Sequence, residues 1–332
     1  MEKKLAVIAL GGNALLRGNQ KGTIEEQNAN TIDTLENLVY LIKEGYNLII
    51  SHGNGPQVGN VLMDNAAGVE KYDNAAMPLD VCVAFTQGQI GYMIERNLRN
   101  ILKEHGIQRN VISMVSQVIV DKNDPALQNP TKRVGKIYMK DEADKLAQEK
   151  GWVFKEEIKV EGGWRRVVPS PDPKDFMNAD LVERLAREGN IVITTGGGGI
   201  PVYIDEKGDI QPIEGVIDKD LASAMVGNRV KADEFYILTD VPYIYKDFKK
   251  PTEKKLEFLD YADTMIIWKM EPLPKVVWPR KSGLVCVSLK PEDKNPLSPR
   301  QPSWKIGDTA PKSPWNTKTT EDNREFKTKN WF

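Results

Sequence analysis

The sequence predicts an α/β fold in which helices sandwich a parallel or mostly parallel sheet, with one small subdomain protruding from it. Three observations predict this fold. Short apolar, β-branched runs recur over residues 5–239, helical patterns lie between them, and one polar stretch interrupts the alternation. Continuous apolar runs are typical of strands covered on both faces, and their alternation with helices is typical of parallel sheets.

The expected strands and helices follow one another along the chain. The apolar runs lie at residues 5–10, 47–51, 111–120, 190–195 and 234–239. The helical patterns lie at residues 24–44, 81–104, 179–188 and 219–226. The first apolar run is too short for a membrane span or a signal peptide and ends in glycine, so we interpret it as a buried strand.

Residues 121–173 break the alternation, and we expect them to form the protruding subdomain. Their polar loops are followed by a helix near residues 141–150 and by a hairpin over residues 156–168, which turns at Gly162-Gly163. A second hairpin is expected over residues 202–213, outside this subdomain.

The composition is that of an ordinary globular protein. The 332 residues include 46 basic and 47 acidic side chains, and this even balance does not indicate a nucleic-acid or membrane partner. The only two cysteines, Cys82 and Cys286, provide neither a disulfide framework nor a metal-binding motif. A reducing cytoplasm fits this composition best.

Three glycine-rich turns follow three of the expected strands. They contain Gly11, Gly12 and Asn13; Gly53, Asn54 and Gly55; and Gly196, Gly197 and Gly198. Backbone without side chains can approach phosphate oxygens and donate N–H groups, and a helix beginning after such a turn adds its positive end. Each turn alone could instead close an ordinary strand–helix unit, although the four glycines at residues 196–199 favour close approach by a ligand. Neither a P-loop nor a G-x-G-x-x-G fingerprint is present, so those nucleotide sites are disfavoured.

Phosphoryl transfer depends on positive charge placed around the moving group. Lys132, in a loop of the expected subdomain, and Lys219, at the expected start of a helix, are the candidate cations. Asp220 could hold the lysine side chains in place, whereas Asp218 is expected to cap the helix. Taken singly, each lysine would more often be a solvated surface charge. His52 is expected to pack or hydrogen-bond within its loop rather than act as a general base.

A possible nucleoside site follows the apolar run at residues 234–239. Asp240, Tyr243 and Tyr245 lie there, where an adenosine could bind. The simpler interpretation is a packed turn at the edge of the sheet.

Together these features closely resemble the carbamate kinases of the amino acid kinase family, in a match that runs from Leu5 to about Leu259. The most specific strings are residues 51–59, residues 120–132 and residues 163–171, the last reading GWRRVVPSP. The resemblance implies a three-layer αβα sandwich, a homodimer, and reversible phosphoryl transfer between ATP/ADP and carbamate/carbamoyl phosphate. It further implies that Mg²⁺ accompanies the nucleotide and that the reaction makes ATP in arginine catabolism.

The resemblance also assigns roles to residues. Phosphates would lie on Gly11, Gly12 and Asn13, the carbamate side on Gly53, Asn54 and Gly55, the transferred group on Lys132 and Lys219, and the nucleoside on Asp240 and Tyr243. Asp220 would organise the lysines. No dedicated carboxylate cage is evident, so Mg²⁺ is expected to be held mainly by nucleotide phosphates and water.

The C-terminal part departs from the family pattern. We divide the chain into an amino acid kinase-like domain at residues 1–260 and an aberrant, proline-rich tail at residues 261–332, irregular from about residue 271. The family motif Gly-Ser-Met-x-Pro-Lys-Val, whose lysine contacts the transferred phosphoryl group, is missing there. However, codons that encode residues 275–282 can be read two nucleotides later as Gly-Ser-Met-Ala-Pro-Lys-Val. We therefore hypothesise a frameshift between residues 259 and 274.

Two competing functions remain at this point. If the tail is genuine, the chain could be a catalytically impaired, nucleotide-binding remnant. A kinase of another small acid, such as acetylglutamate, is disfavoured by the protruding segment but is not excluded.

Overall fold

In this computed structural model of the protein, the described residues are 3–17, 20–157, 160–239, 244–246, 254–256, 283–290 and 303–306. They include a central sheet of seven strands in the order β16-β15-β12-β1-β2-β9-β3. The strands are β1 Leu5–Leu10, β2 Asn47–His52, β3 Val111–Ser113, β9 Ile191–Ile193, β12 Glu234–Thr239, β15 Gly283–Lys290 and β16 Ser303–Ile306. The five from β12 to β3 run parallel, so the expectation of a mostly parallel sheet is confirmed.

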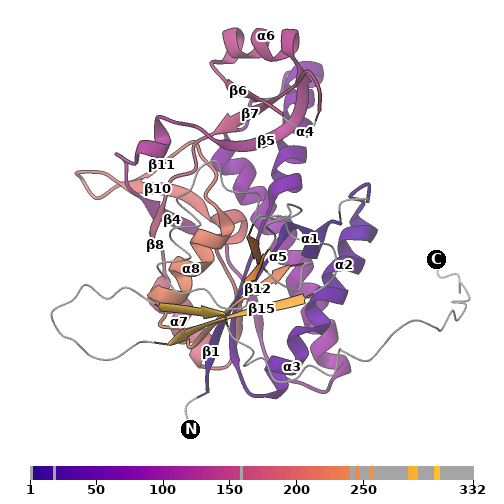
Figure 1. Ribbon diagram of the computed structural model, residues 1–332, viewed down its shortest axis with the longest axis vertical. Coiled ribbons are helices and arrows are strands. Elements are labelled where there is room, and N and C mark those ends of the chain that lie inside the picture. Colours follow the sequence, from indigo (N-terminus) through magenta and orange to yellow (C-terminus); the bar gives the residue numbers. More distant parts are fainter. Residues whose placement is uncertain are drawn as a thin grey trace, which may run out of the picture.

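Helices cover both faces of the sheet, which confirms the three-layer arrangement (Figure 1). One face is covered by α2 Ile24–Glu36, α3 Leu38–Lys43 and α5 Leu79–Glu104, and the other by α7 Ala179–Arg187 and α8 Lys219–Arg229. Two further helices, α1 Gly12–Leu15 and α4 Gly55–Tyr72, follow β1 and β2 directly.

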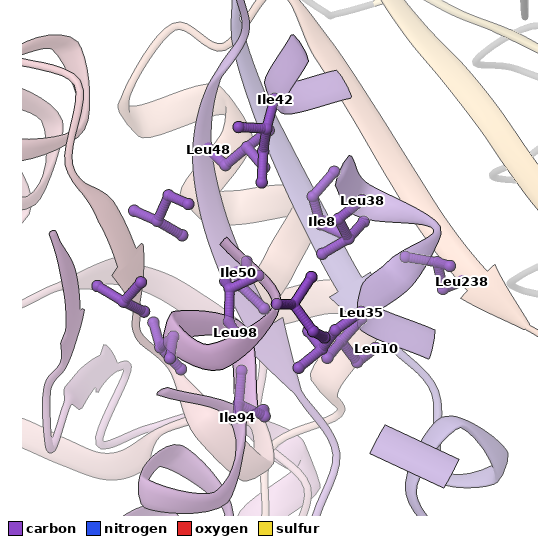
Figure 2. Packing of buried hydrophobic residues seen from close by; sticks show 14 of the residues in the cluster. Ile8, Leu10, Leu35, Leu38, Ile42, Leu48, Ile50, Ile94, Leu98 and Leu238 are labelled. Carbon is purple, nitrogen blue, oxygen red and sulfur yellow. The ribbon is translucent and has the colours of Figure 1, made fainter. Parts of the chain in front are cut away.

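The apolar pattern of β1 explains why two layers of helices are needed. Successive side chains of a strand point to opposite faces of its sheet. Accordingly, Ile8 and Leu10 pack with α2, α3 and α5 (Figure 2), whereas Val7 packs with α7 and α8 on the opposite face. All six residues of β1 are fully buried, as expected for a strand at the centre of such a sheet.

A second sheet adjoins the first, in the order β11-β10-β4-β8. Its strands are β4 Gln117–Val120, β8 Pro173–Phe176, β10 Ile200–Ile204 and β11 Ile210–Pro212. The hairpin expected over residues 202–213 is present as β10 and β11. The expectation of one strand over residues 111–120 is wrong, because this run divides into β3 of the central sheet and β4 of the second sheet.

The protruding part consists of a three-stranded sheet, β5-β7-β6, and one helix (Figure 1). These elements are β5 Lys132–Met139, α6 Lys140–Lys150, β6 Val153–Glu156 and β7 Gly163–Val168. Strands β6 and β7 pair as a hairpin, but the expected bounds were wrong, because the first strand ends at Glu156 and Gly163 begins β7 instead of lying in the turn. A short 3₁₀ turn at Pro125–Leu127 precedes β5. Lys132 was expected in a loop, but it is the first residue of β5.

The expectation of an irregular tail needs correction for twelve of its residues. Strand β15 pairs antiparallel with β12, and β16 pairs antiparallel with β15, so the described parts of residues 283–306 extend the central sheet. Alternating β-branched residues in Gly283–Lys290 favour this strand. The rest of the tail lies outside the described residues. Before the tail, β13 Ile244–Lys246 and β14 Lys254–Leu256 form an antiparallel hairpin. Among the helices described, none is long and apolar enough to cross a membrane.

Candidate active site

The first two glycine turns and Lys219 meet at the carboxyl ends of β1 and β2, two neighbouring strands of the central sheet. Strands β1 and β2 are parallel neighbours, so the turns at their carboxyl ends are adjacent. The Gly53 N–H donates to the Leu10 carbonyl at 3.1 Å, and this bond ties the second turn to the end of β1. A Cβ atom placed on Gly53 would lie 3.0 Å from Cδ of Lys219 and 3.9 Å from the backbone nitrogen of Gly12. The absence of a side chain at position 53 therefore makes room for the lysine.

The third turn follows β9, the other neighbour of β2, and packs against the second turn. A Cβ atom on Gly196 would overlap the His52 ring, and one on Gly197 would overlap the Asn54 amide. Gly198 has a φ of +90° and leaves no space for a Cβ beside the Ile217 carbonyl. Contacts within the protein thus suffice to explain these glycines, and close approach by a ligand at this turn stays a prediction.

The helix that follows the second turn begins with its N–H groups uncapped by a side chain. Asn54 occupies the N-cap position of α4, but its amide instead donates to Thr86 Oγ1 at 3.0 Å. Pro56, in the first turn of α4, contributes no N–H group. The Gly55 N–H and the positive end of an 18-residue helix consequently remain available to an anion.

Not every turn amide is available in this way. The Gly11 N–H donates to the Leu238 carbonyl at 3.0 Å, as the Gly53 N–H does to Leu10. These two amides join neighbouring strand ends, so Gly12 and Gly55 are the better candidates for donating to an anion.

The two candidate lysines have separate carboxylate partners. Lys219 Nζ lies 2.5 Å from Asp220 Oδ1, and Lys132 Nζ lies 2.9 Å from Asp218 Oδ2. The sequence had suggested Asp220 as the partner of both lysines, whereas in the structure Lys132 forms its ion pair with Asp218. Lys132 comes from the protruding subdomain and Lys219 from α8, so the junction between them brings the two cations to one region.

Asp218 has two roles at this junction. Its Oδ1 atom accepts from the backbone N–H of Asp220 at 2.9 Å, which caps α8, and its Oδ2 atom binds Lys132. Burial by itself would raise the pKa of Asp218, but the Lys132 ammonium and the Asp220 N–H outweigh burial and place that pKa below its ordinary value. Asp218 is therefore a carboxylate at neutral pH.

His52 is buried beside the turns and is uncharged. Burial lowers the pKa of His52 to about 4, against a smaller opposing effect of its hydrogen bond to the Gly53 carbonyl, to which Nδ1 donates at 2.9 Å. This environment fits a loop-packing residue, as the sequence led us to expect.

Comparison with known proteins identifies the family of this chain. Residues 4–271 match the sequence profile described as "Amino acid kinase family". The chain belongs to the amino acid kinase family.

Relatives of this amino acid kinase include a carbamate kinase of Thermococcus kodakarensis, 51% identical over 254 residues that cover 76% of this chain and 80% of the relative. A carbamate kinase of Pyrococcus horikoshii is 52% identical over 235 residues, covering 71% and 74% of the two chains. Among solved structures, carbamate kinase from Giardia lamblia bound to AMP-PNP superposes with a TM-score of 0.70 at 39% identity, covering 77% of this chain and 79% of the other. The family match places this protein among the phosphotransferases.

One buried contact of this kinase was missed by sequence reasoning. The Ser51 and Ser223 hydroxyls lie 2.5 Å apart, and Ser223 also donates to the Lys219 carbonyl at 2.5 Å. This chain of hydrogen bonds connects the end of β2 to the first turn of α8, where Lys219 lies. Serine has no sequence signal that distinguishes such a contact from ordinary solvent exposure.

Several expected site residues lie outside the described part of the structure. Asp240 and Tyr243 are not described, and for Tyr245 only the backbone, in β13, is described. Asn13 lies in α1, but its side chain is likewise outside the description. The proposed nucleoside contacts therefore stay predictions.

No group of three or more metal-binding side chains occurs within the residues that the structure describes. Among the described site residues, the carboxylates of Asp218 and Asp220 are each paired with a lysine. The described residues thus do not fit a metal held by the protein alone.

Proposed function

We propose that this chain is a carbamate kinase, which transfers a phosphoryl group reversibly between ATP and carbamate to give ADP and carbamoyl phosphate. The observation that carries this proposal is the meeting of Lys219 with the turns after β1 and β2, in a chain whose relatives are carbamate kinases. We further propose that the enzyme works in the cytoplasm, where it makes ATP from carbamoyl phosphate during arginine catabolism.

The proposed chemistry depends on charge placed around the transferred phosphoryl group. Such transfer asks for little covalent participation by the protein and much electrostatic stabilisation. Lys132 and Lys219 supply two positive charges, and the N–H groups of Gly12 and Gly55 supply donors on the same side of the sheet. Because Asp218 and Asp220 hold the lysines before substrate binds, little reorganisation is needed when charge develops.

Mg²⁺ belongs in this proposal as a companion of the nucleotide. It would neutralise phosphate charge, and nucleotide phosphates and water would be its main ligands. The pairing of Asp218 and Asp220 with lysines supports this assignment over a metal site built from these two carboxylates.

A homodimer is the assembly that we propose. The exposed apolar residues Val81, Phe85 and Tyr92 lie on one face of α5, and β3 forms an edge of the central sheet beside this helix. Large apolar side chains exposed on one helix face beside a sheet edge are commonly buried against a second subunit.

The test is ATP formation from carbamoyl phosphate and ADP by the purified full chain. We expect Lys219→Ala to lower kcat about 100-fold or more while changing the affinity for ADP far less, because the charge acts mainly on the transferred group. Lys207→Ala, at an exposed hairpin turn, is the matched control and should behave as wild type.

Three results would contradict parts of this proposal. Equal losses of kcat and nucleotide affinity would remove the role of Lys219. Turnover of acetylglutamate without turnover of carbamoyl phosphate would identify a different acid substrate. ADP binding without any turnover would favour the impaired, nucleotide-binding remnant.

A further inference from the structure

The protruding subdomain contacts the core at two places, through β5 against α4 and through a short segment that leads directly into α8. This segment, residues 214–218, is called the docking segment here. Glu214, Val216 and Asp218 alternate along it, and each contacts strand β5 or β7 or the residue that follows β7. Glu214 and Asp218 make these contacts through their carboxylates and Val216 through its backbone N–H, so the segment is held to the subdomain at both ends and in the middle.

Two ion pairs cross this junction. Lys132 of β5 binds Asp218, and Arg166 of β7 binds Glu214 through Nη2 and Oε1. In the ladder of β5 and β7, Lys132 lies opposite Val168 and Val134 lies opposite Arg166, so these four side chains share one face of the subdomain sheet. The two cations lie on one diagonal of that face and the two valines on the other.

The valines form the apolar centre of the junction. Val134 and Val168 are buried in one cluster with Val216 of the docking segment. Between the two ion pairs, the Val216 N–H donates to the Pro169 carbonyl at 3.0 Å. Gly215 permits this approach, since a Cβ atom there would lie 3.0 Å from the same carbonyl oxygen.

Arg166 is the more constrained member of its ion pair. Its side chain is 9% exposed and lies over the Trp152 ring, with 4.1 Å from Cζ to the ring centroid, whereas the Glu214 side chain is 63% exposed. A buried guanidinium requires a charged partner, because an unpaired buried charge is strongly unfavourable. On the opposite face of the ladder, Arg133 and Arg165 bind Glu157 within the subdomain and do not reach the docking segment.

We propose that Arg166 and Glu214 are positioning residues: their ion pair fixes the subdomain on the docking segment and so sets where the Lys132 ammonium lies over the active site. The inference rests on the proposed function, because it concerns the same site. Neither residue needs to touch substrate. Lys132 begins β5, two residues before the strand position that faces Arg166, so a shift of the β5–β7 ladder displaces the ammonium directly.

The test compares Glu214→Ala with Glu206→Ala. Glu206 also forms an exposed ion pair, with Lys122 at 3.4 Å, but it lies at the hairpin turn between β10 and β11. We expect Glu214→Ala to lower kcat about tenfold while the KM for ADP stays within about twofold, because misplacement of a catalytic group lowers the rate of the chemical step. Glu206→Ala should leave both constants unchanged.

Two further measurements separate positioning from a general structural effect. In a Lys132→Met background, assayed at enzyme concentrations that keep its rate measurable, Glu214→Ala should cause no additional loss of kcat. Hydrogen exchange at the Val216 amide should be about tenfold faster in Glu214→Ala than in wild type, and unchanged in Glu206→Ala.

The proposal is overturned if Glu214→Ala has wild-type kcat, if its loss of kcat is undiminished in the Lys132→Met background, or if Val216 exchange is unaffected. The exchange measurement does not require catalysis. A chain that turns over no carbamoyl phosphate would therefore overturn the proposed function, while the exchange result would still decide whether the ion pair holds the junction.

Discussion

At the scale of single residues, charge in the site is arranged as two separate lysine–carboxylate pairs. Lys219 is 21% exposed and Lys132 is 35% exposed, so both ammonium groups are partly removed from water yet reachable by a polar ligand. Isolated exposed ion pairs contribute little to stability. In this site the two pairs hold both ammonium groups near the N-terminus of α8, because Asp218 and Asp220 both lie there.

His52 provides a prediction about stability and pH. Its folded pKa of about 4 lies below the ordinary 6.5, so the unfolded chain binds this proton more readily, and stability falls as the pH drops through the range between these values. From pH 7.5 to pH 5 the wild type should lose about 2 kcal/mol more unfolding free energy than His52→Gln, measured by urea denaturation.

His105→Gln is the control for this measurement, because His105 is the only other histidine and lies at the surface end of α5. This variant keeps His52 and should therefore retain the loss of stability attributed to that residue. An identical pH dependence for wild type and His52→Gln would show that His52 does not titrate in this range.

The separation of two residues along the sequence decides which of the site's ion pairs could be predicted. Lys219 and Asp220 are adjacent, so their pairing was within reach of sequence reasoning. Asp218 was correctly expected to cap α8, but its ion pair with Lys132 spans 86 positions of sequence and has no local signal. The same holds for Arg166 and Glu214, which only the packing of the subdomain brings together.

At the scale of elements, the turn after β9 requires glycine for two reasons, a positive φ angle and a lack of room for a Cβ atom. Gly198 combines a φ of +90° with a close carbonyl, whereas Gly208, at a hairpin turn, has a φ of +87° and no atom within 4 Å of a Cβ position. Alanine at Gly208 should cost about 1–2 kcal/mol through conformation alone. Alanine at Gly198 should cost about 2 kcal/mol more, because the Ile217 carbonyl must also move.

Urea denaturation of both variants checks this difference. Equal losses of unfolding free energy would mean that the turn relaxes without cost and that close packing does not explain Gly198. The comparison is well matched, since both glycines have the same sign and nearly the same value of φ.

The boundaries of elements show where sequence patterns were sufficient. Buried strands such as β1 and β12 were predictable, because both faces are apolar and the run ends at the turn. The run at residues 111–120 was misjudged as one strand. Apolar residues resume after each of its polar positions, Ser113 and Ser116-Gln117, and the pairing of β3 with β9 and of β4 with β10 separates its two halves.

At the scale of the whole molecule, the C-terminal region decides how complete the enzyme is. The family match ends at residue 271 of 332, and the described strands β15 and β16 lie beyond it, at the β12 edge of the central sheet. Many sequences can add a strand to the edge of a sheet, because the added strand is held by backbone hydrogen bonds. A catalytic cation, in contrast, requires a particular side chain at a particular place.

The frameshift hypothesis therefore yields the last prediction. Moving the gene into the alternative frame between residues 259 and 274 restores Gly-Ser-Met-Ala-Pro-Lys-Val and, with it, a third lysine for the transferred phosphoryl group. Loss of one such charge costs about 3 kcal/mol, so the reframed chain should form ATP from carbamoyl phosphate about 100-fold faster than the chain with the present tail. Resequencing the gene across this region comes first. If one intact frame encodes the present tail and the two chains have equal kcat, the third lysine is dispensable and the hypothesis fails.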